Sequence, residues 1–358
     1  MKKSVVLFSL MITVLAIISY SCKKEEPITE PAPAERKKCA WVSGQIDSTG
    51  FGVILFSADS GETWVRQAQN LAGLQGVDVI DIWAVDENKV WAIGSKNVIL
   101  KTINGGQTWT QVMAPTNNAN PELMAISVVD KTNIWISGDN GTVYNSTNDG
   151  STWTMFDTSI FSNGGMQGIW AISQQKVFVV GGISGGNERG FIGYTINGGL
   201  SWDSVVPEND FNKNEWIGVT AYENTIVVYG RKAHYIVSND GGTTWTNDSV
   251  EGTGGGGGPA DINHLVMLNS LTWWGAFDEG QIFITTDGGI SWAAQQTDAG
   301  GFYLIGLDAW DAQLALVVGT SLSWPQKGPL LKTAIGGNLW ERKFLYNSPL
   351  TKVTFIKR

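Results

Sequence analysis

Two residue types that often carry chemistry are scarce in this sequence. Its 358 residues include two cysteines, Cys22 and Cys39, and two histidines, His234 and His264. So few cysteines cannot form a disulfide framework, and no group of His, Cys, Asp and Glu has the spacing of metal ligands. Neither histidine stands near a Ser or Cys motif typical of a catalytic triad. We therefore predict no metal site and no cofactor, and expect Cys39, in the apolar stretch CAWVSG, to be a buried small residue.

Positive charge is also limited. The chain has 24 lysines and arginines against 33 aspartates and glutamates, a formal net charge of −9. The basic residues form no cluster. Binding to nucleic acid or to anionic lipid headgroups requires clustered Lys and Arg side chains. The sequence therefore argues against both kinds of partner.

The apolar run at the N-terminus is too short to cross a bilayer comfortably. It extends over the 14 residues Val5 to Ile18, behind Lys2 and Lys3. Basic, apolar and then small residues in this order predict a secretory signal peptide at residues 1–21. The stretch Ser19-Tyr20-Ser21-Cys22 resembles the lipobox of bacterial lipoproteins, in which the peptide is cleaved before the cysteine and the cysteine is acylated. An ordinary signal peptide with a chance cysteine is the alternative.

Residues 22–38 predict a lipidated Cys22 followed by a flexible tether. The segment KKEEPITEPAPAERKK is rich in Pro, Glu and Lys and too poor in apolar residues to order itself. Lysines and glutamates directly after the cysteine are similar to those of lipoproteins of the Bacteroidota, where an acidic patch often marks export to the cell surface. The resemblance implies a lipid-anchored protein of the outer membrane or cell surface, attached to the membrane only through its N-terminal lipid.

One turn, exemplified by TINGGQTW at 102–109, is repeated seven times. The other copies are SADSGETW (57–64), STNDGSTW (146–153), TINGGLSW (195–202), SNDGGTTW (238–245), TTDGGISW (285–292) and the altered TAIGGNLW (333–340). Their terminal tryptophans are Trp64, Trp109, Trp153, Trp202, Trp245, Trp292 and Trp340, spaced 43 to 49 residues apart. A period in this range is the length of one four-stranded propeller blade.

Each repeat contains four short strand patterns, so we predict an all-β domain over residues 39–358. In the second unit VIDIWAV, KVWAIG and NVILKT precede the turn, and TWTQVM follows it. The first unit starts at CAWVSG without an inner strand, whereas the chain ends on LTKVTFIKR, which has the inner-strand pattern. We predict a monomeric seven-bladed propeller whose C-terminal strand closes the ring. A right-handed β-solenoid is the alternative, although its coils are usually shorter.

The repeated turn has a structural explanation. Asp or Asn at its third position can bond a backbone N–H two residues on, and Gly at the fifth supplies positive φ. The third-position residues are Asp59, Asn104, Asn148, Asn197, Asp240 and Asp287; in the seventh copy Ile335 stands there. This pattern resembles the Asp-box or BNR repeat. The six polar residues are a blade apart, too far to share a metal ion, so we interpret the boxes as structural.

Function is expected on the opposite face, in the loops between second and third strands and between blades. Candidate binding residues there are Phe161, Glu188, Arg189, Phe302, Tyr303 and Trp324. Asp-boxes occur in sialidases, which hold their substrate carboxylate with three arginines. Here Arg66 and Arg342 follow box tryptophans, and no Arg-Ile-Pro motif appears, so sialidase activity is not expected.

Units such as VWAIGSKNVILKTINGGQTW are similar over the whole propeller to the photosystem II stability/assembly factor-like family. That resemblance implies the fold and a general binding role, although the basic contact patch of the photosynthetic members is missing. We expect a non-catalytic module that binds or scaffolds an envelope protein or polysaccharide. The alternative is a glycan-active enzyme, a glycoside hydrolase of sialidase-like fold, with two carboxylates across a cleft.

Overall fold

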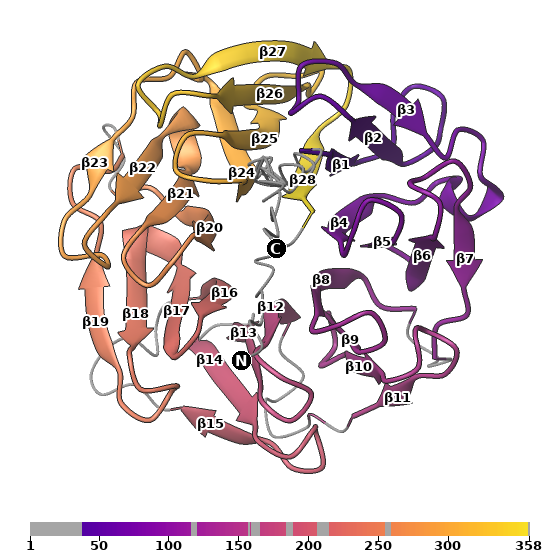
Figure 1. The fold of residues 1–358 in the computed structure, drawn as a ribbon, viewed down its shortest axis with the longest axis horizontal. Coiled ribbons are helices and arrows are strands. Elements are labelled where there is room, and N and C mark those ends of the chain that lie inside the picture. Colours follow the sequence, from indigo (N-terminus) through magenta and orange to yellow (C-terminus); the bar gives the residue numbers. More distant parts are fainter. Residues whose placement is uncertain are drawn as a thin grey trace, which may run out of the picture. The chain divides into compact units, whose positions relative to one another are not determined.

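The computed structural model describes residues 38–115, 120–156, 158, 165–183, 189–205, 215–254 and 259–356. These residues form seven four-stranded antiparallel sheets, arranged as the blades of a ring (Figure 1). The seven-bladed propeller predicted from the repeats is confirmed, and the solenoid alternative is excluded. Within these described residues, three short 3-10 segments accompany the strands: η1 (Ala72–Leu74), η4 (Arg231–Ala233) and η5 (Asp278–Gly280). Over this described part of the chain, no helix has the length and apolar character needed to span a membrane.

We number the blades along the chain and give their strands from the inner to the outer edge. Blade 1 has β28 (Leu350–Phe355), β1 (Ala40–Gly44), β2 (Val53–Ser57) and β3 (Val65–Gln67); blade 2 has β4 (Val79–Ala84), β5 (Val90–Gly94), β6 (Val98–Thr102) and β7 (Thr110–Val112). Blade 3 has β8 (Leu123–Val128), β9 (Ile134–Gly138), β10 (Val143–Ser146) and β11 (Thr154–Met155); blade 4 has β12 (Gly165–Ala171), β13 (Val177–Ile183), β14 (Arg189–Thr195) and β15 (Asp203–Val205). Blade 5 has β16 (Trp216–Tyr222), β17 (Thr225–Gly230), β18 (His234–Ser238) and β19 (Thr246–Ser249). Blade 6 has β20 (Ile262–Met267), β21 (Trp273–Phe277), β22 (Ile282–Thr285) and β23 (Ala293–Ala294); blade 7 has β24 (Phe302–Ala309), β25 (Ala315–Ser321), β26 (Gly328–Thr333) and β27 (Glu341–Tyr346).

The C-terminal strand closes the ring, as predicted. Strand β28 pairs antiparallel with β1, with Val353 opposite Val42 and Phe355 opposite Ala40. Leu350, Val353 and Phe355 are buried between blades 7 and 1. Closure leaves no blade with an uncovered face, which a linear stack of repeats could not achieve.

Every inner strand carries one β-bulge at the same place. In β4 the register shifts between Val79 and Asp81, so Ile80 is the extra residue, and all six other inner strands shift at the equivalent step. The extra residues are Ile80, Met124, Gln167, Ile217, Asn263, Ile305 and Thr351. A bulge bends its strand and re-aims the side chains beside it, and these side chains line the central channel of the ring.

A glycine at or near the end of the second strand makes room for the bulge in six blades. They are Gly44, Gly94, Gly138, Gly181, Gly230 and Gly319; in blade 6 Phe277 stands at this position. A Cβ at Gly94 would lie 2.1 Å from the carbonyl oxygen of Asp78, and one at Gly319 would lie 1.9 Å from that of Tyr303. These glycines therefore permit close backbone approach.

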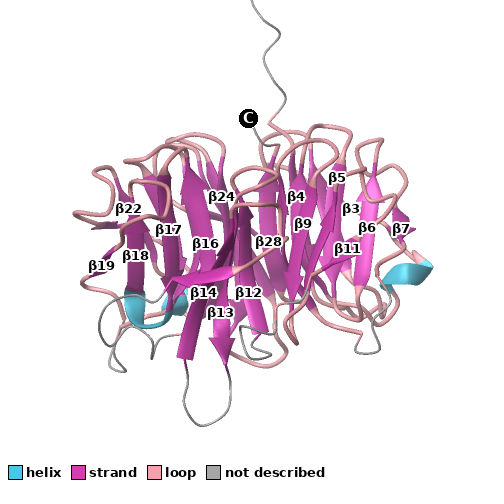
Figure 2. Cartoon of the chain, turned by 90° about the horizontal axis from the view of Figure 1, so that it is seen from below, coloured by secondary structure: helices cyan, strands magenta, loops and turns pink. Residues whose placement is uncertain are grey.

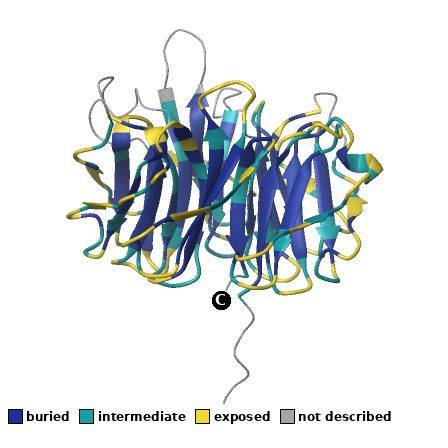
Figure 3. Ribbon diagram, turned by 90° about the horizontal axis from the view of Figure 1, so that it is seen from above, coloured by how far each residue is buried: buried dark blue, intermediate teal, exposed yellow. Residues whose placement is uncertain are grey.

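The core lies between neighbouring blades, and the box tryptophans contribute to it. Trp153 of blade 3 packs edge-on against Trp91 of blade 2, with ring centroids 6.2 Å apart. Trp340 contacts Trp274 of blade 6 in the same way at 5.6 Å. Figure 3 shows the buried strands inside the blades and the exposed residues along loops and outer strands. Each box tryptophan thus stabilises the contact with the preceding blade, as its large apolar surface allows.

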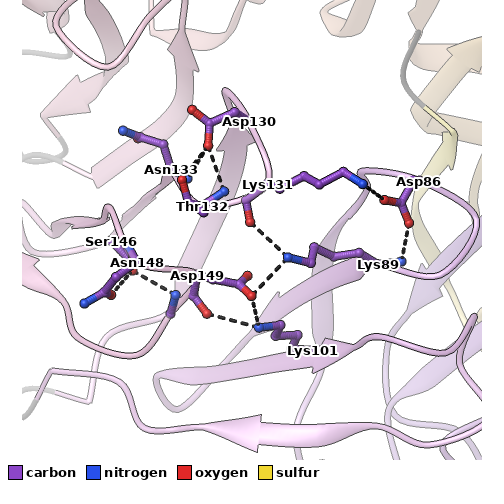
Figure 4. A network of polar contacts seen from close by, with 11 residues as sticks. Asp86, Lys89, Lys101, Asp130, Lys131, Thr132, Asn133, Ser146, Asn148 and Asp149 are labelled. Carbon is purple, nitrogen blue, oxygen red and sulfur yellow. Dashed lines mark hydrogen bonds and ion pairs between the residues drawn. The ribbon is translucent and has the colours of Figure 1, made fainter.

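The hydrogen bonds of the box turns differ in one respect from the expectation. In the third box Asn148 Oδ1 accepts the backbone N–H of Thr152, four residues on, at 2.9 Å. It also accepts a hydrogen bond from the Ser146 hydroxyl at 3.0 Å (Figure 4). The N–H two residues on, that of Gly150, is bonded instead by the Ser146 hydroxyl at 2.8 Å. The hydroxyl of the opening Ser or Thr therefore accepts the N–H inside the tight turn. The side-chain oxygen of the Asp or Asn accepts the N–H of the residue four positions further on. The same pattern occurs at Asp59, Asn104, Asn197, Asp240 and Asp287.

Candidate binding groove and central channel

The propeller has two faces of different construction. The box turns connect third to fourth strands on one face, which we call the box face. The connections between second and third strands and between blades lie on the opposite face, the loop face, at the lower edge of Figure 2, where the 3-10 segments are seen. The described chain begins at the box face, because the Lys38 carbonyl accepts the N–H of Ser60 in the first box.

A groove opens on the loop face at the junction of blades 7 and 1. It has a volume of about 730 Å³. It is lined by Gln45, Ile46, Asp47 and Ser48 of blade 1, by Leu322, Trp324, Pro325 and Gln326 of blade 7, and by Asn347, Ser348 and Pro349 of the connection between them. Because the chain ends of the ring meet here, the groove is formed by segments some 300 positions apart in the sequence.

The rim of this groove is apolar and exposed. The Trp324 side chain is 87% exposed, and Leu322 and Ile46 are exposed beside it. An indole left in water without a packing partner costs free energy that a bound ligand would recover. Exposed tryptophans over a depression are characteristic anchors of binding interfaces.

The floor of the groove is polar and held by one arginine. Arg66 of β3 pairs with Asp47 and donates a hydrogen bond to the Tyr346 hydroxyl of β27 at 2.6 Å. It also donates to the Gly52 carbonyl at 2.8 Å. Partial burial raises the pKa of Asp47, but hydrogen bonds from Thr49 and the Arg66 ion pair outweigh it, and the net shift is downward. Asp47 is therefore ionised. Its contacts with Arg66 and Tyr346 join blade 1 to blade 7 at the groove.

The predicted face residues fall into three groups. Trp324 lines the groove, and Tyr303 is 40% exposed on the same face. Phe302 is buried and stacks near the Arg342 guanidinium, because neighbouring side chains of β24 point to opposite sides of the sheet. Phe161 and Glu188 lie outside the described residues, as does the side chain of Arg189, whose backbone begins β14. Cys22 also lies outside them.

An acidic cluster occupies another part of the loop face, between blades 5 and 6. Arg231 forms an ion pair with Glu215 at 2.7 Å and approaches Asp261 at 3.6 Å. Asn263 donates to Asp278 Oδ1 at 2.8 Å. Burial raises the pKa of Asp278, and the neighbouring carboxylates of Asp261 and Glu279 raise it further. A carboxyl group whose pKa is raised in this way is a candidate general acid.

The central channel is another cavity of the propeller, with a volume of about 410 Å³. The residues directly after the seven bulges occupy equivalent positions in the inner strands: Asp81, Ala125, Gly168, Gly218, His264, Gly306 and Lys352. All of them except Gly306 line the channel. Asp81 accepts the N–H of Ile126 in the next blade at 3.0 Å, and His264 Nδ1 accepts that of Leu307 at 3.2 Å. Trp83 and Trp170 approach each other one layer nearer the box face, with centroids 5.6 Å apart.

Sequence reasoning missed the groove floor and the channel cluster. Asp47, Arg66 and Tyr346 meet only because the ring closes, so no local pattern connects them. The channel did leave a signal, since His264 and Lys352 are polar residues at the equivalent step of otherwise apolar inner-strand patterns. Of the described residues, no group of three or more His, Cys, Asp and Glu side chains is placed to hold a metal ion.

Comparisons with known proteins agree with this architecture. The family model described as Photosynthesis system II assembly factor YCF48 matches residues 72–210. A structure of YCF48 bound to D1 peptide has a TM-score of 0.57 and 18% identity, covering 74% of this chain and 81% of its own. YCF48 from Cyanidioschyzon merolae has a TM-score of 0.59 and 17% identity, covering 85% and 97%. The chain is a BNR-type β-propeller.

The same fold occurs in an enzyme. The GH74 xyloglucanase from Xanthomonas campestris has a TM-score of 0.64 and 12% identity, covering 90% of this chain and 53% of its own. This chain thus matches about half of that enzyme. No curated protein matches the sequence.

Proposed function

We propose that this protein is a non-catalytic cell-envelope lipoprotein whose propeller binds a segment of another envelope protein in the groove between blades 7 and 1. The single observation that carries the proposal is Trp324, exposed at the rim of an open groove. A protein segment with one apolar side chain would cover the indole and displace the water held over Leu322 and Ile46.

The chemistry of the groove favours binding over hydrolysis. A glycoside hydrolase needs two carboxyl groups, one of them protonated as the acid. Asp47 is the one carboxylate that lines the groove among the described residues, and its pKa is lowered. A related architecture also supports a protein ligand, since a YCF48 propeller has been solved with a D1 peptide bound.

The position of the chain entry supports the membrane arrangement. Residue 38 lies on the box face, so a lipid on Cys22, attached through residues 23–37, would anchor the protein from that side. The groove lies on the face opposite to the one at which this segment joins the propeller. Metabolic labelling with a radioactive fatty acid tests the anchor: label is expected on the full chain and absent from the Cys22→Ala variant. Equal labelling of both would contradict lipidation at this residue.

The binding proposal is tested by site-specific photocrosslinking in the native envelope. A benzophenone amino acid at position 322, beside Trp324, should capture one protein band, and Trp324→Ala in the same chain should abolish it. A benzophenone at position 200, where Leu200 is exposed on the box face, is the matched control and should not give that band. A band that survives Trp324→Ala would refute this groove. Retention on envelope polysaccharide without any protein crosslink would instead assign a glycan ligand.

A second candidate function rests on the raised pKa of Asp278. The carboxylates of Asp278 and Asp261 could serve as acid and base of a glycan-active enzyme, as the xyloglucanase fold relative suggests. The test is reducing-sugar release from a polysaccharide panel that includes xyloglucan. Activity lost in both Asp278→Asn and Asp261→Asn, but retained in Trp324→Ala, would establish the enzyme. Absence of activity on the panel would leave the binding proposal favoured.

A further inference from the structure

The described residues contain three asparagines that are directly followed by glycine. These steps are Asn104-Gly105, Asn140-Gly141 and Asn197-Gly198. In such a step the backbone nitrogen of the glycine can attack the side-chain carbon Cγ of the asparagine. Glycine favours this reaction because it has no Cβ to shield its nitrogen or to restrict the backbone rotation that brings the two atoms together. Whether a step reacts in the folded protein therefore depends on what holds these two groups.

The step at Asn104 lies in the box turn of blade 2, where both reacting groups are held. The Gly105 N–H donates to the Asn88 carbonyl at 2.9 Å. Asn104 Oδ1 accepts the Thr102 hydroxyl at 2.9 Å and the Thr108 N–H at 3.0 Å. The Asn104 Nδ2 group donates to the Thr108 hydroxyl at 2.9 Å. The side-chain carbon cannot turn toward the glycine nitrogen until these bonds break.

The step at Asn197, in the box turn of blade 4, is held in the same way. The Gly198 N–H donates to the Gln175 carbonyl at 3.0 Å. Asn197 Oδ1 accepts the Thr195 hydroxyl at 2.9 Å and the Ser201 N–H at 3.0 Å, and its Nδ2 donates to the Ser201 hydroxyl at 2.8 Å. The box turn thus protects an Asn-Gly step as a consequence of its structural hydrogen bonds.

The step at Asn140 lies on the loop face, in the tight turn between β9 and β10. Asn140 and Gly141 have φ values of 52° and 70°. The Thr142 N–H donates to the Asp139 carbonyl at 3.0 Å and closes the turn. Two successive positive φ values define the hairpin turn in which Asn-Gly is the favoured pair. The bond that closes this turn uses neither of the two reacting groups.

Both reacting groups of this third step are free of hydrogen bonds within the described part of the chain. The Asn140 side chain is exposed, and neither its amide nor the Gly141 N–H has a bonding partner there. The Thr158 hydroxyl donates to the Gly141 carbonyl, which takes no part in the reaction. Local opening of an exposed turn is frequent in folded proteins. At Asn140 such opening is enough to let the two groups meet.

We propose that Asn140 is a site of spontaneous deamidation, through which the loop face of blade 3 gains a carboxylate as the protein ages. The Gly141 nitrogen gives up its proton and forms a bond to Asn140 Cγ. The side-chain nitrogen takes up a proton and leaves as ammonia, and a five-membered succinimide ring remains. One water molecule then opens the ring at either of its carbonyl groups, which gives aspartate or isoaspartate at position 140. The reaction needs no oxidant or reductant.

The modification changes the turn in charge and, for one product, in shape. Either product places a negative charge next to that of Asp139. Isoaspartate also lengthens the main chain by one carbon atom, so the bond from the Thr142 N–H to the Asp139 carbonyl cannot keep its present geometry. The box turns stay unmodified because their Asn-Gly steps are held.

Peptide mass spectrometry of the folded protein, incubated at mildly alkaline pH, tests this site. The rate of deamidation is measured at the three steps, and isoaspartate is detected with protein isoaspartyl methyltransferase. Asn140 should deamidate at least about tenfold faster than Asn104 and Asn197, because the bonds of the box turns must break before those two can react. The variant Asn140→Gln would have to close a six-membered ring. It should lose the modification at position 140 and leave the rates at Asn104 and Asn197 unchanged.

A measurement in concentrated guanidinium chloride separates the effect of the fold from that of the sequence. Unfolding removes the hydrogen bonds of the box turns, so the three steps should then deamidate at similar rates. An Asn140 rate in the folded protein no higher than that of Asn104 or Asn197 would overturn the proposal. The same holds if the excess at Asn140 persists after unfolding, since neighbouring residues and not the turn would then set the rate.

Discussion

The box face and the loop face of this propeller are opposite ends of the same strands, yet they follow different rules. Seven turns on the box face share one geometry, with paired positive-φ residues and one hydroxyl that bonds the fifth residue. The connections on the loop face differ in length and sequence from blade to blade. Repetition on one face reflects a repeated structural task, namely joining two strands and packing onto the preceding blade. The proposed binding groove lies where that repetition stops.

The altered seventh box shows which part of the turn is indispensable. Ile335 replaces the Asp, and Leu339 replaces the Thr or Ser of the other copies. Nevertheless Gly336 and Gly337 keep φ values of 66° and 82°, and the Gly337 N–H still bonds the Thr333 hydroxyl at 3.0 Å. Glycine conformation and the first hydroxyl therefore set the turn, and the Asp or Asn only adds hydrogen bonds to it.

The largest loss of stability is expected when the glycine opposite a bulge is replaced. This glycine is the one feature near the loop face that repeats from blade to blade. In Gly94→Ala the new Cβ would lie 2.1 Å from the Asp78 carbonyl oxygen, so the inner strand must move. We expect a loss of about 2–3 kcal/mol in the free energy of unfolding, as for other overpacked sites. Urea unfolding measures it. Gly300→Ala, where a Cβ meets open space, is the control, and equal losses in both would contradict the close-approach explanation.

A smaller loss of stability is expected when the third residue of a box is replaced by Ala, and this loss should differ between an intact box and the altered seventh one. Asn148→Ala removes the bonds to the Thr152 N–H and hydroxyl at 2.9 and 2.7 Å, which should cost about 1 kcal/mol. Ile335→Ala at the equivalent place should cost clearly less, because the side chain is half exposed and makes no such bonds. Ile335→Asp should stabilise the protein. If Asn148→Ala and Ile335→Ala unfold at the same urea concentration, the side-chain cap contributes nothing.

Much of the fold could be predicted because its signals are local. The turn residues, the four strand patterns and the missing inner strand of blade 1 all stand within single repeats. The sequence predicts that Asn148 accepts the N–H two residues on, whereas it accepts the N–H of Thr152, four residues on. The sequence does not reveal that the Gly150 N–H already donates to the Ser146 hydroxyl. The groove depends on Asp47, Arg66 and Tyr346, which come from both ends of the ring. Exposure of Trp324 and burial of Phe302 likewise depend on packing that no repeat unit contains.

Acid should destabilise the box turns that contain Asp more than those that contain Asn. Hydrogen bonds from the Thr63 side chain and backbone lower the pKa of Asp59 to about 2. Thr244 and Ser291 likewise lower the pKa values of Asp240 and Asp287. Because the unfolded value is about 3.9, their stabilisation is complete above pH 4 and is lost as the pH falls toward 2.

Asn104, Asn148 and Asn197 make the same turns without titrating. The triple variant Asp59→Asn, Asp240→Asn, Asp287→Asn should therefore lose Tm less steeply than the parent between pH 4 and 2. Exposure to solvent keeps the difference small and salt-sensitive. Superimposable Tm curves across this range would show that the Asp boxes contribute no acid sensitivity.

The smallest effect on stability is expected at Trp324, the residue on which the proposed binding groove depends. Trp324 is 87% exposed, so Trp324→Ala should change the free energy of unfolding by less than about 0.5 kcal/mol. The crosslink beside the groove should nevertheless disappear. A loss above about 1 kcal/mol would mean that the indole packs onto the fold in solution. Trp324 would then belong with the box tryptophans as a structural residue, and the distinction between the two faces would no longer hold at this position.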